Sequence, residues 1–497
     1  MKKTAAILAA AMLGAAVLSM TASAADDNLV IAVSEDIDTL HPMNYSTSVE
    51  AMVLNQIYDP LIYMNPDGAE DPEPRLAESW EVSDDGLDYT FHLRDGVTFQ
   101  DGTALTADDV VFSLEQYQKS EYQGSNVDGL DTVEAKDEHT VVCHLSQPYS
   151  PFMLGLSSCH IASKAYYDSV GEDEFAATPN GTGPYKFVSR ATGSNITLEA
   201  NEDYYGGAPA IKSVTIEVIP DSATTAIALQ TGEVSFAEIE SSSLAQLEAN
   251  NAITIARAET SGFSYVTMNT EKEPFNNPTF RQAVNYAINR ENVINVVYDG
   301  EAEENSNICA KSRFGYSDDQ PQYTYDPDKA KELLKEAGIE TPYDLGTILV
   351  AEKYEPLATV IQSDLAAVGL NADISVEEFN TYIGDLTSGN YGISALEMTL
   401  EGDTQQLEMA LMTDYIGTAN NARYSDSAMD DLFNQAKTET DSSKRSEIFN
   451  QIFTKAQDEA AYAVICNPDI LYAYSSDLKV PEFPLEGYYY INQFSWN

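Results

Sequence analysis

Residues Arg75 to Glu115 read RLAESWEVSDDGLDYTFHLRDGVTFQDGTALTADDVVFSLE, and this stretch decides the fold. Within it Tyr89, Phe91 and Leu93 alternate with other residues, so their side chains fall on one face of an extended strand. Short alternating runs on both sides of a turn are typical of a β-hairpin region. The stretch therefore predicts strand, turn and helix in close succession.

The two Asp-Gly pairs at 95–96 and 101–102 raise the question of an ion site. An EF-hand loop that began at the first aspartate would need glycine at its sixth position, where the chain has Gln100. A phosphate cradle would need a lysine at the helix start. The helix start here is Thr106-Ala107-Asp108-Asp109, which contains no cation. Tight turns followed by a capping box explain the same residues, so we interpret the stretch as scaffold.

Strands and helices alternate along the rest of the chain. The apolar run Leu29 to Val33 predicts a buried strand, and residues 48–62 have apolar side chains at helical spacing. Thr279 to Gly300 predicts one long amphipathic helix, and a further helix is predicted from Pro327 to a glycine stop at Gly338. The fold class is therefore mixed α/β. A chain of 497 residues is also long enough for more than one core.

The N-terminus predicts export. Two lysines precede an apolar run that ends in Ala22-Ser23-Ala24, the small-residue pattern at which a secretory signal is cut, so residues 1–24 are expected to be a signal peptide. No cysteine precedes Cys143, so we expect no lipid anchor and a location in the periplasm or cell-envelope space. The formal net charge of −54 disfavours nucleic acid as a partner.

The sequence contains none of the residue spacings that are typical of metal sites or catalytic motifs. The histidines lack the HxxxH and HExxH patterns of zinc sites, and no G-x-S-x-G elbow occurs. We expect no enzyme, no cofactor and no metal site. The cysteines lack CxxC spacing; an oxidising compartment permits three full pairings, among which the Cys143–Cys159 loop is the easiest to close. The four cysteines are Cys143, Cys159, Cys309 and Cys466.

Five segments, in order, give the chain a family resemblance. Arg75 to Glu115 resembles the signature of the family 5 solute-binding proteins, the dipeptide, oligopeptide and nickel receptors of ABC importers. The further segments that resemble this family are GTGPYKF from Gly181, NEDYYGGAPAIKSVTIEVIPD from Asn201, MNTEKEPFNNPTFRQAVNYAINRENVINVVYDG from Met268 and YSDDQPQYTYDPDKAKELLKEAG from Tyr316.

The resemblance implies a periplasmic-binding-protein clamshell of the large three-domain type, with two lobes of mixed sheets flanked by helices. It implies a discontinuous first domain of residues 25–57, 178–262 and 472–497. A second domain, 58–177, would pack on the first, and a third, 263–471, would form the opposite lobe. Ligand would be enclosed between the lobes by hinge closure.

The resemblance also implies where ligand binds. Peptide-binding members hold the ligand's α-ammonium with an acid in a W-x-x-D segment, which Met398 to Asp403 matches here, with Glu401 at the acid's position and Met398 in place of tryptophan. The other positions carried over, also predicted to contact ligand, are Ser46, Thr47 and Ser48, then Gly262 and Phe263 beside the lobe crossing, Phe314, and Tyr354 beside Lys353.

We therefore predict a receptor that captures short peptides and delivers them to an ABC permease, and that acts as a monomer. The same scaffold serves nickel chelates, opines and oligosaccharides. All five histidines precede residue 161, which argues against a nickel site. Outside this class, an exported hydrolase would show turnover, and an acidic, chaperone-like surface protein would lack a saturable pocket. The 30 tyrosines suit closure over a small organic ligand.

Overall fold

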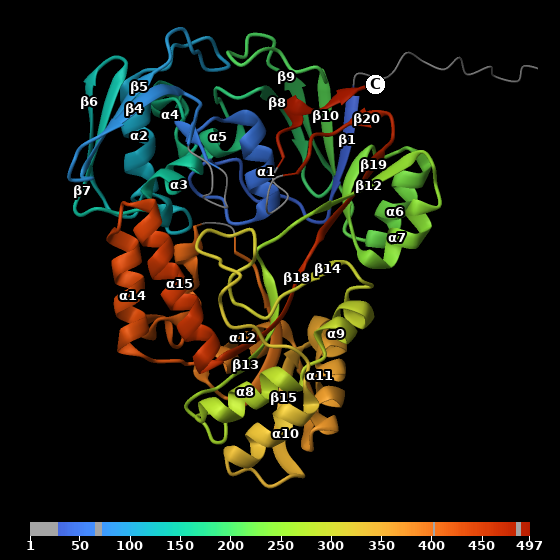
Figure 1. Ribbon diagram of the computed structural model, residues 1–497. Helices are drawn as coiled ribbons and strands as arrows, with labels where there is room; N and C mark the ends of the chain where they lie inside the picture. Colours follow the sequence, from blue (N-terminus) through green and yellow to red (C-terminus); the bar gives the residue numbers. More distant parts are fainter. Residues whose placement is uncertain (1–27, 65–71, 401–402, 484–488) are drawn as a thin grey trace, which may run out of the picture.

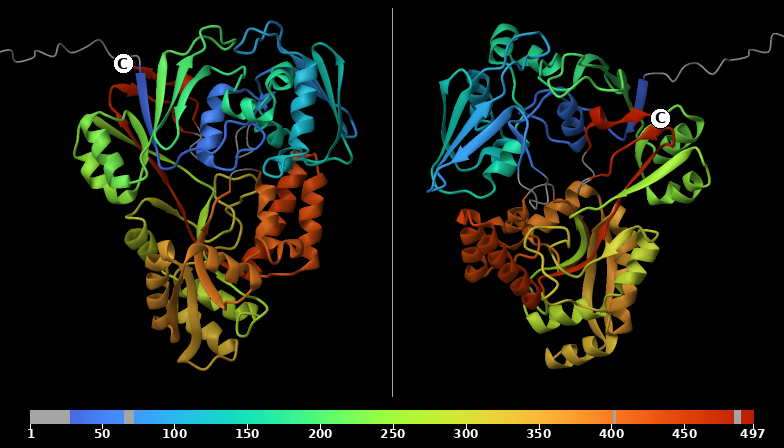
Figure 2. Two further views of the ribbon diagram at one scale, coloured as in Figure 1. Left: turned by 180° about the vertical axis from the view of Figure 1, so that it is seen from behind. Right: turned by 45° about the horizontal axis from the view of Figure 1, so that its top comes forward.

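The chain folds into two lobes, one above the other in the view of Figure 1. The computed structural model describes residues 28–64, 72–400, 403–483 and 489–497. The upper lobe in Figure 1 contains a seven-stranded and a four-stranded sheet, and the lower lobe contains a six-stranded sheet. We call them the N-terminal lobe and the C-terminal lobe. The two further views in Figure 2 show the same division.

The seven-stranded sheet is the centre of the N-terminal lobe. Its β1 is the predicted buried strand, and it pairs in parallel with β10 and β11, while the other pairings are antiparallel. Helices α6 (Ser222–Thr231) and α7 (Ser241–Glu248) pack beside it. In spatial order the strands are β12 (Ile253–Ala258), β19 (Ile470–Ser475), β11 (Phe236–Ile239), β1 (Asn28–Val33), β10 (Ser213–Val218), β9 (Asn195–Ala200) and β8 (Tyr185–Ala191).

The four-stranded antiparallel sheet contains the stretch that decides the fold. Tyr89, Phe91 and Leu93 of β5 are buried on one face, as predicted. Gly96 and Gly102 have φ of 75° and 88°, the left-handed conformation that the Asp-Gly turns require. The strands are β4 (Ala77–Val82), β5 (Asp88–Leu93), β7 (Thr140–Leu145) and β6 (Leu130–Asp137), with α3 (Phe152–Ser157), α4 (Lys164–Val170) and α5 (Glu172–Ala177) following.

The predicted capping box at the start of α2 (Ala107–Tyr117) is confirmed. Asp109 Oδ2 accepts hydrogen bonds from the backbone N–H and the hydroxyl of Thr106, both at 2.9 Å. The carboxylate therefore satisfies a donor that the first turn of a helix leaves without an intrahelical partner. Burial raises the pKa of Asp109, while its hydrogen bonds from Lys164 and Thr106 oppose that shift.

A glycine turn fixes the two sheets of the N-terminal lobe to one helix. Gly183 donates its N–H to the Ile57 carbonyl at 2.8 Å, at the end of α1 (Ser48–Ile57). Gln100, from the deciding stretch, donates to the carbonyls of Ile57 at 3.2 Å and Tyr185 at 2.7 Å. Beside this turn, burial raises the pKa of Asp59 to about 6, although Thr182 and other hydroxyls donate to it.

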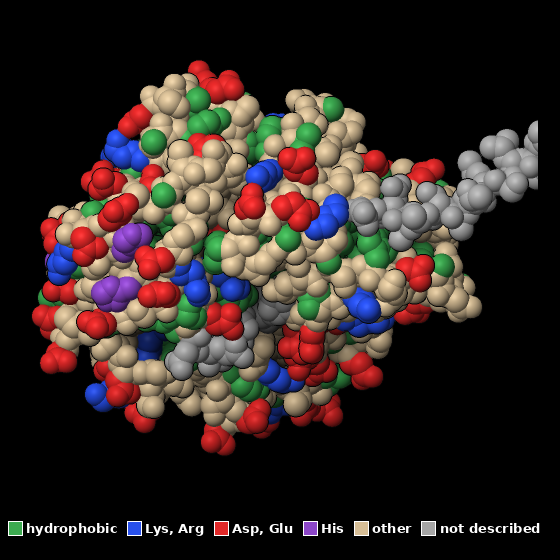
Figure 3. Space-filling model, turned by 90° about the horizontal axis from the view of Figure 1, so that it is seen from above, with side chains coloured by type: hydrophobic (Ala, Val, Ile, Leu, Met, Phe, Trp, Pro, Cys, Tyr) green, Lys and Arg blue, Asp and Glu red, His purple; other side chains and the backbone are tan. Residues whose placement is uncertain are grey.

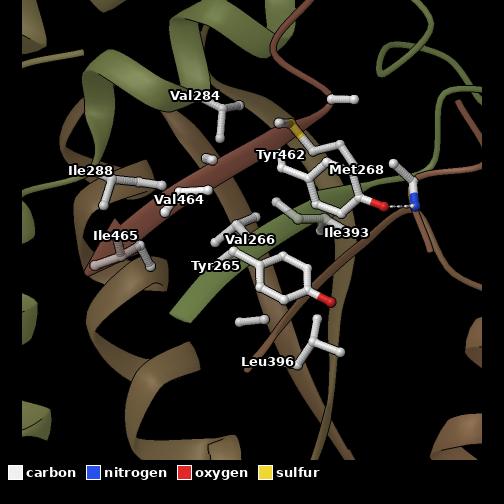
Figure 4. Packing of buried hydrophobic residues seen from close by; sticks show 14 of the residues in the cluster. Tyr265, Val266, Met268, Val284, Ile288, Ile393, Leu396, Tyr462, Val464 and Ile465 are labelled. Atoms are coloured by element: carbon white, nitrogen blue, oxygen red, sulfur yellow. Dashed lines mark hydrogen bonds between the residues drawn. The ribbon is translucent and has the colours of Figure 1, made fainter. Parts of the chain in front are cut away.

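The six-stranded sheet forms the core of the C-terminal lobe. Figure 4 shows Tyr265 and Val266 on β13 packed among side chains of β17, β18 and α8 (Pro278–Ala287). These side chains are buried, which is the main favourable contribution to folding. In spatial order the strands are β14 (Ala302–Glu304), β18 (Tyr462–Pro468), β13 (Phe263–Met268), β17 (Ile393–Met398), β15 (Tyr343–Ala351) and β16 (Leu370–Glu377).

The single long helix predicted from Thr279 to Gly300 is wrong. The chain breaks at Ile288, whose backbone is extended, and Asn289 caps a new helix, α9 (Arg290–Val297), by accepting the Asn292 N–H at 3.1 Å. An asparagine side chain that competes for the backbone favours such a cap over a helix interior. Helix α10 (Pro327–Glu336) is confirmed, with Gly338 at φ 79° after its end.

The remaining helices of the C-terminal lobe cover its sheet and reach toward the other lobe. Helices α11 (Glu355–Ala367) and α12 (Phe379–Ser388) pack against the six-stranded sheet, and α13 (Glu408–Leu411) is a single turn. The pair α14 (Ser427–Thr438) and α15 (Ser442–Glu459) stands below the four-stranded sheet (Figure 1). In that view the helix pair also lies below α3.

The chain crosses between the lobes twice, at adjacent places. One crossing joins β12 to β13 and the other joins β18 to β19. Thr260 Oγ1 donates to the Pro468 carbonyl at 2.9 Å, and Asn467 Nδ2 donates to the Gly262 carbonyl at 2.8 Å, so side chains tie the crossings together. We keep the division into residues 25–57, 178–262 and 472–497, then 58–177, then 263–471, as a prediction.

The surface and the thiols complete the description. Acidic side chains are spread over the face drawn in Figure 3 without gathering at one point. All four cysteines are buried free thiols, so no pairing, including Cys143–Cys159, is formed. The predicted signal peptide lies outside the described residues. Of the helices in the described ranges, none combines the length and apolar composition needed to cross a bilayer.

Candidate functional site

A cavity of about 410 Å³ lies between the two lobes. The N-terminal lobe contributes residues from 45–64, from 123–128, from 149–158 and Tyr490, and the C-terminal lobe contributes residues from 403–415. Its volume falls in the lower part of the range of roughly 300–1,000 Å³ that is usual for small-molecule sites. The stretch Phe91 to Ser113 contributes none of the described lining residues.

Glu50 shapes the loop that lines one side of the cavity. Its carboxylate, only 1% exposed, accepts backbone N–H groups from both ends of the loop: Asp38 at 2.8 Å, Thr39 at 3.0 Å, Ser46 at 2.7 Å and Thr47 at 3.2 Å. Thr47 Oγ1 in turn accepts the Glu50 N–H at 3.2 Å, a capping box at the start of α1. The predicted ligand contacts Ser46, Thr47 and Ser48 all line the cavity.

Aromatic side chains line the cavity from both lobes. The rings of Tyr63 and Tyr490 meet edge to face with centroids 5.8 Å apart. Burial and, to a smaller extent, the neighbouring Glu408 carboxylate together raise the pKa of the Tyr415 phenol to about 12. The phenol therefore stays protonated at neutral pH. A phenol offers both an apolar face and a hydrogen-bonding hydroxyl. The tyrosines that line the cavity are Tyr45, Tyr63, Tyr149, Tyr415 and Tyr490.

The carboxylate of Asp403 lines the cavity and is already paired. Arg445 binds it with both terminal nitrogens, one at 3.0 Å from Oδ2 and the other in a shorter contact with Oδ1. Asp403 Oδ1 also accepts the Gln405 N–H at 2.7 Å. Phe314 lies behind this pair, with its ring centroid 5.4 Å from the Arg445 guanidinium. Asp403 therefore presents a neutralised carboxylate to the cavity.

A second ion pair lies beside the first. Lys437 Nζ is 2.9 Å from Glu408 Oε2, and Gln405 Nε2 donates to the same oxygen at 2.7 Å. Tyr415 donates its hydroxyl to Glu408 Oε1 at 3.0 Å. On the C-terminal side, both acids of the described cavity wall are thus compensated by a cation behind them.

The other residues predicted to contact ligand lie outside the described lining. Phe263 is 1% exposed in the core of the C-terminal lobe, and Tyr354 is 7% exposed there. Gly262 lies in the crossing, where an added Cβ would be 2.9 Å from the Met398 carbonyl oxygen. Glu401 lies outside the described residues. The roles of these residues in binding stay predictions.

A local sequence pattern could have indicated some residues of the site, while others have no such pattern. The Thr47-x-x-Glu50 spacing is a capping-box pattern that could have marked Glu50 as the centre of its loop. Tyr149 and Glu408 enter the cavity only because the two lobes meet, so no local pattern indicates them. Among the residues that the structure describes, no three His, Cys, Asp or Glu are placed to hold a metal ion.

The lobes also bind each other directly at the rim of the cavity. The Ser150 N–H donates to the Lys437 carbonyl at 2.9 Å, and its hydroxyl donates to the Glu439 carbonyl, at the end of α14. These bonds join the turn before α3 to the C-terminal lobe, away from the two crossings. They can exist only when the lobes are close together.

Ser150→Ala is expected to increase the open population of the free protein about fivefold, since one lost hydrogen bond is worth ~1 kcal/mol. Small-angle scattering should report a larger radius of gyration than for the unchanged protein. Ser169→Ala removes a hydroxyl that binds only within α4 and serves as the control. Identical scattering from all three proteins would show that the contact does not hold the lobes together.

Comparisons with known proteins agree with this architecture. Residues 71–413 match the model of the bacterial extracellular solute-binding proteins, family 5. The chain is 32% identical to heme-binding protein A of Haemophilus influenzae, covering 83% of this chain and 82% of that protein. It is 29% identical to the dipeptide-binding protein of Escherichia coli, over 82% of this chain and 83% of that protein.

The fold agrees with a solved relative along nearly the whole chain. The ABC transporter substrate-binding protein CtaP of Listeria monocytogenes superimposes with a TM-score of 0.86 at 28% identity, covering 94% of this chain and 99% of that one. The predicted clamshell fold is thereby confirmed. The chain belongs to the bacterial extracellular solute-binding proteins of family 5, the non-enzymatic substrate-binding components of ABC transporters.

Proposed function

We propose that the protein captures short peptides between its lobes and delivers them to the permease of an ABC importer. The observation that carries this proposal is the inter-lobe cavity of about 410 Å³. Its size suits a ligand of a few residues better than a long chain. The dipeptide-binding relative, at 29% identity, supports the same ligand class.

The lining suits a peptide backbone. Ser46, Thr47 and Ser48 offer hydroxyl groups, and Asn55 and Asn126 offer amides that both donate and accept hydrogen bonds. His160 positions Asn55 through a contact of 2.9 Å, and because burial lowers the pKa of His160 to about 4, this imidazole is neutral at neutral pH. These neutral donors and acceptors match the amide groups of a peptide backbone.

The test is the unfolding temperature of the purified protein with a panel of di- to pentapeptides, glutathione, sugars, nickel chelates and heme. A peptide at one hundred times its Kd should stabilise the native state by about 2.7 kcal/mol and raise the unfolding temperature. Glu401→Ala should abolish the shift if Glu401 holds the α-ammonium, as we predict from the family resemblance. Stabilisation by heme alone would overturn the peptide assignment and favour the ligand named for the Haemophilus relative.

A further inference from the structure

The charges around the cavity are not balanced. Of the described residues that line it, three are acids, Asp128, Asp403 and Glu408, and none is lysine, arginine or histidine. Arg445 and Lys437 stand behind the wall and neutralise Asp403 and Glu408 at hydrogen-bond distance. One carboxylate, that of Asp128, is therefore left over.

Asp128 is the acid that the N-terminal lobe contributes. It follows the short helix η1 (Gly124–Val127), and its side chain accepts no hydrogen bond and forms no ion pair with any residue in the described ranges. Partial burial raises the pKa of Asp128, with Lys437 lowering it and Glu408 raising it across the cavity. Asp128 is exposed to solvent, so its carboxylate is open to a ligand that enters the cavity.

The ring of Tyr149 stands next to this carboxylate. The side chain of Tyr149 lies over Gly129, where an added Cβ would be 3.0 Å from Tyr149 Cβ. The Tyr149 phenol is close enough to Asp128 and Glu408 for both carboxylates to raise its pKa, in addition to the larger effect of burial. A carboxylate without an ion-pair partner beside an aromatic ring is an arrangement that attracts an organic cation, through charge and through the ring quadrupole.

We propose that Asp128 accepts a cationic ammonium group of the ligand, so that the cavity selects peptides that place an ammonium against the N-terminal lobe. This inference rests on the proposed function. It concerns another residue than Glu401, for which a role in holding the α-ammonium stays a prediction. A ligand held by Asp128 on one side and by the C-terminal wall on the other contacts both lobes, so its binding energy favours the closed arrangement.

The ammonium has two sources in a peptide, the N-terminus and a lysine side chain. Three probes distinguish them: Lys-Ala, norleucyl-Ala, which lacks the side-chain ammonium, and Nα-acetyl-Lys-Ala, which lacks the terminal one. Calorimetric titration of each probe would be made with the unchanged protein, with Asp128→Asn and with Asp131→Asn. Asp131 is exposed on β6 outside the described lining, and its change alters the net charge by the same amount.

Asp128→Asn should lower the affinity for the probes that carry the relevant ammonium by roughly 10- to 100-fold, the usual effect of a charged hydrogen bond. A loss for Lys-Ala but not norleucyl-Ala identifies the side chain; a loss for both, but not for the acetylated probe, identifies the N-terminus. Equal affinities of Asp128→Asn and Asp131→Asn for every probe would overturn the inference and leave the peptide function standing. Failure of the unchanged protein to bind any peptide would overturn both.

Discussion

Replacing Gly183 by alanine is expected to lower the free energy of unfolding of the N-terminal lobe by about 3 kcal/mol or more, beyond the usual cost of overpacking. The added Cβ would be 2.5 Å from the Ile57 carbonyl carbon and 2.7 Å from the Gln56 carbonyl oxygen. Both atoms belong to backbone at the end of α1, which cannot swing aside as a side chain can. The turn must separate from the helix, and the Gly183–Ile57 hydrogen bond is lost with it.

The measurement is urea unfolding followed by tryptophan fluorescence. The only two tryptophans, Trp80 and Trp496, both lie in the N-terminal lobe, so their emission reports that lobe selectively. Gly384→Ala in α12 is the control, because apart from the neighbouring residues and the backbone of its own helix nothing described lies within 4 Å of the added Cβ, and alanine is the better helix former. It should leave the tryptophan transition in place. A Gly183→Ala transition at the unchanged urea concentration would show that the turn tolerates the methyl group.

Glu50→Gln is expected to lower the free energy of unfolding by roughly 3 kcal/mol and to weaken ligand binding at least about tenfold. The carboxylate receives four backbone N–H groups, and an amide keeps one acceptor oxygen while turning two donors toward the remaining N–H groups. The loop from Asp38 to Thr47 then loses its anchor. Because Ser46 and Thr47 line the cavity, stability and affinity should fall together.

Glu115→Gln provides the matched control, since Glu115 is exposed on α2 and the change is chemically the same. It should alter stability by less than about 0.5 kcal/mol and leave ligand affinity unchanged. Both variants would be compared by urea unfolding and by titration with the peptide that stabilises the protein most. Normal affinity in a destabilised Glu50→Gln would separate the loop from binding and contradict the positioning role.

Local chemistry was readable from the sequence where a few neighbouring residues decide it. The hairpin strand with Tyr89, Phe91 and Leu93 inside follows from alternation, and the start of α2 follows from Thr106 and Asp109. The helix predicted from Thr279 to Gly300 failed because its apolar spacing continues through Ile288, while the cap formed by Asn289 depends on one side chain. Periodicity alone does not indicate such a break.

The cavity was only partly predictable, because it depends on contacts between distant segments. Asp403 was predicted from the family pattern, yet its pairing with Arg445, 42 residues later, follows only from the position of α15. Phe314 lies against that guanidinium, outside the described lining, and its contact with ligand stays a prediction. Asp128 is one of 80 acids and has no distinguishing neighbours in sequence. The charge left over at Asp128 is visible only once both lobes are placed.

The position of β19 has a consequence for the order in which the lobes can form. This strand, residues 470–475, lies between β11 and β12, inside the first sheet rather than at its edge. During synthesis, every strand of the C-terminal lobe leaves the ribosome before β19 does. The seven-stranded sheet must therefore wait until the C-terminal lobe has been synthesised, with β11 and β12 unpaired on the sides that β19 will join. A late, sequence-distant strand of this kind delays completion of the seven-stranded sheet until the C-terminal lobe has been synthesised.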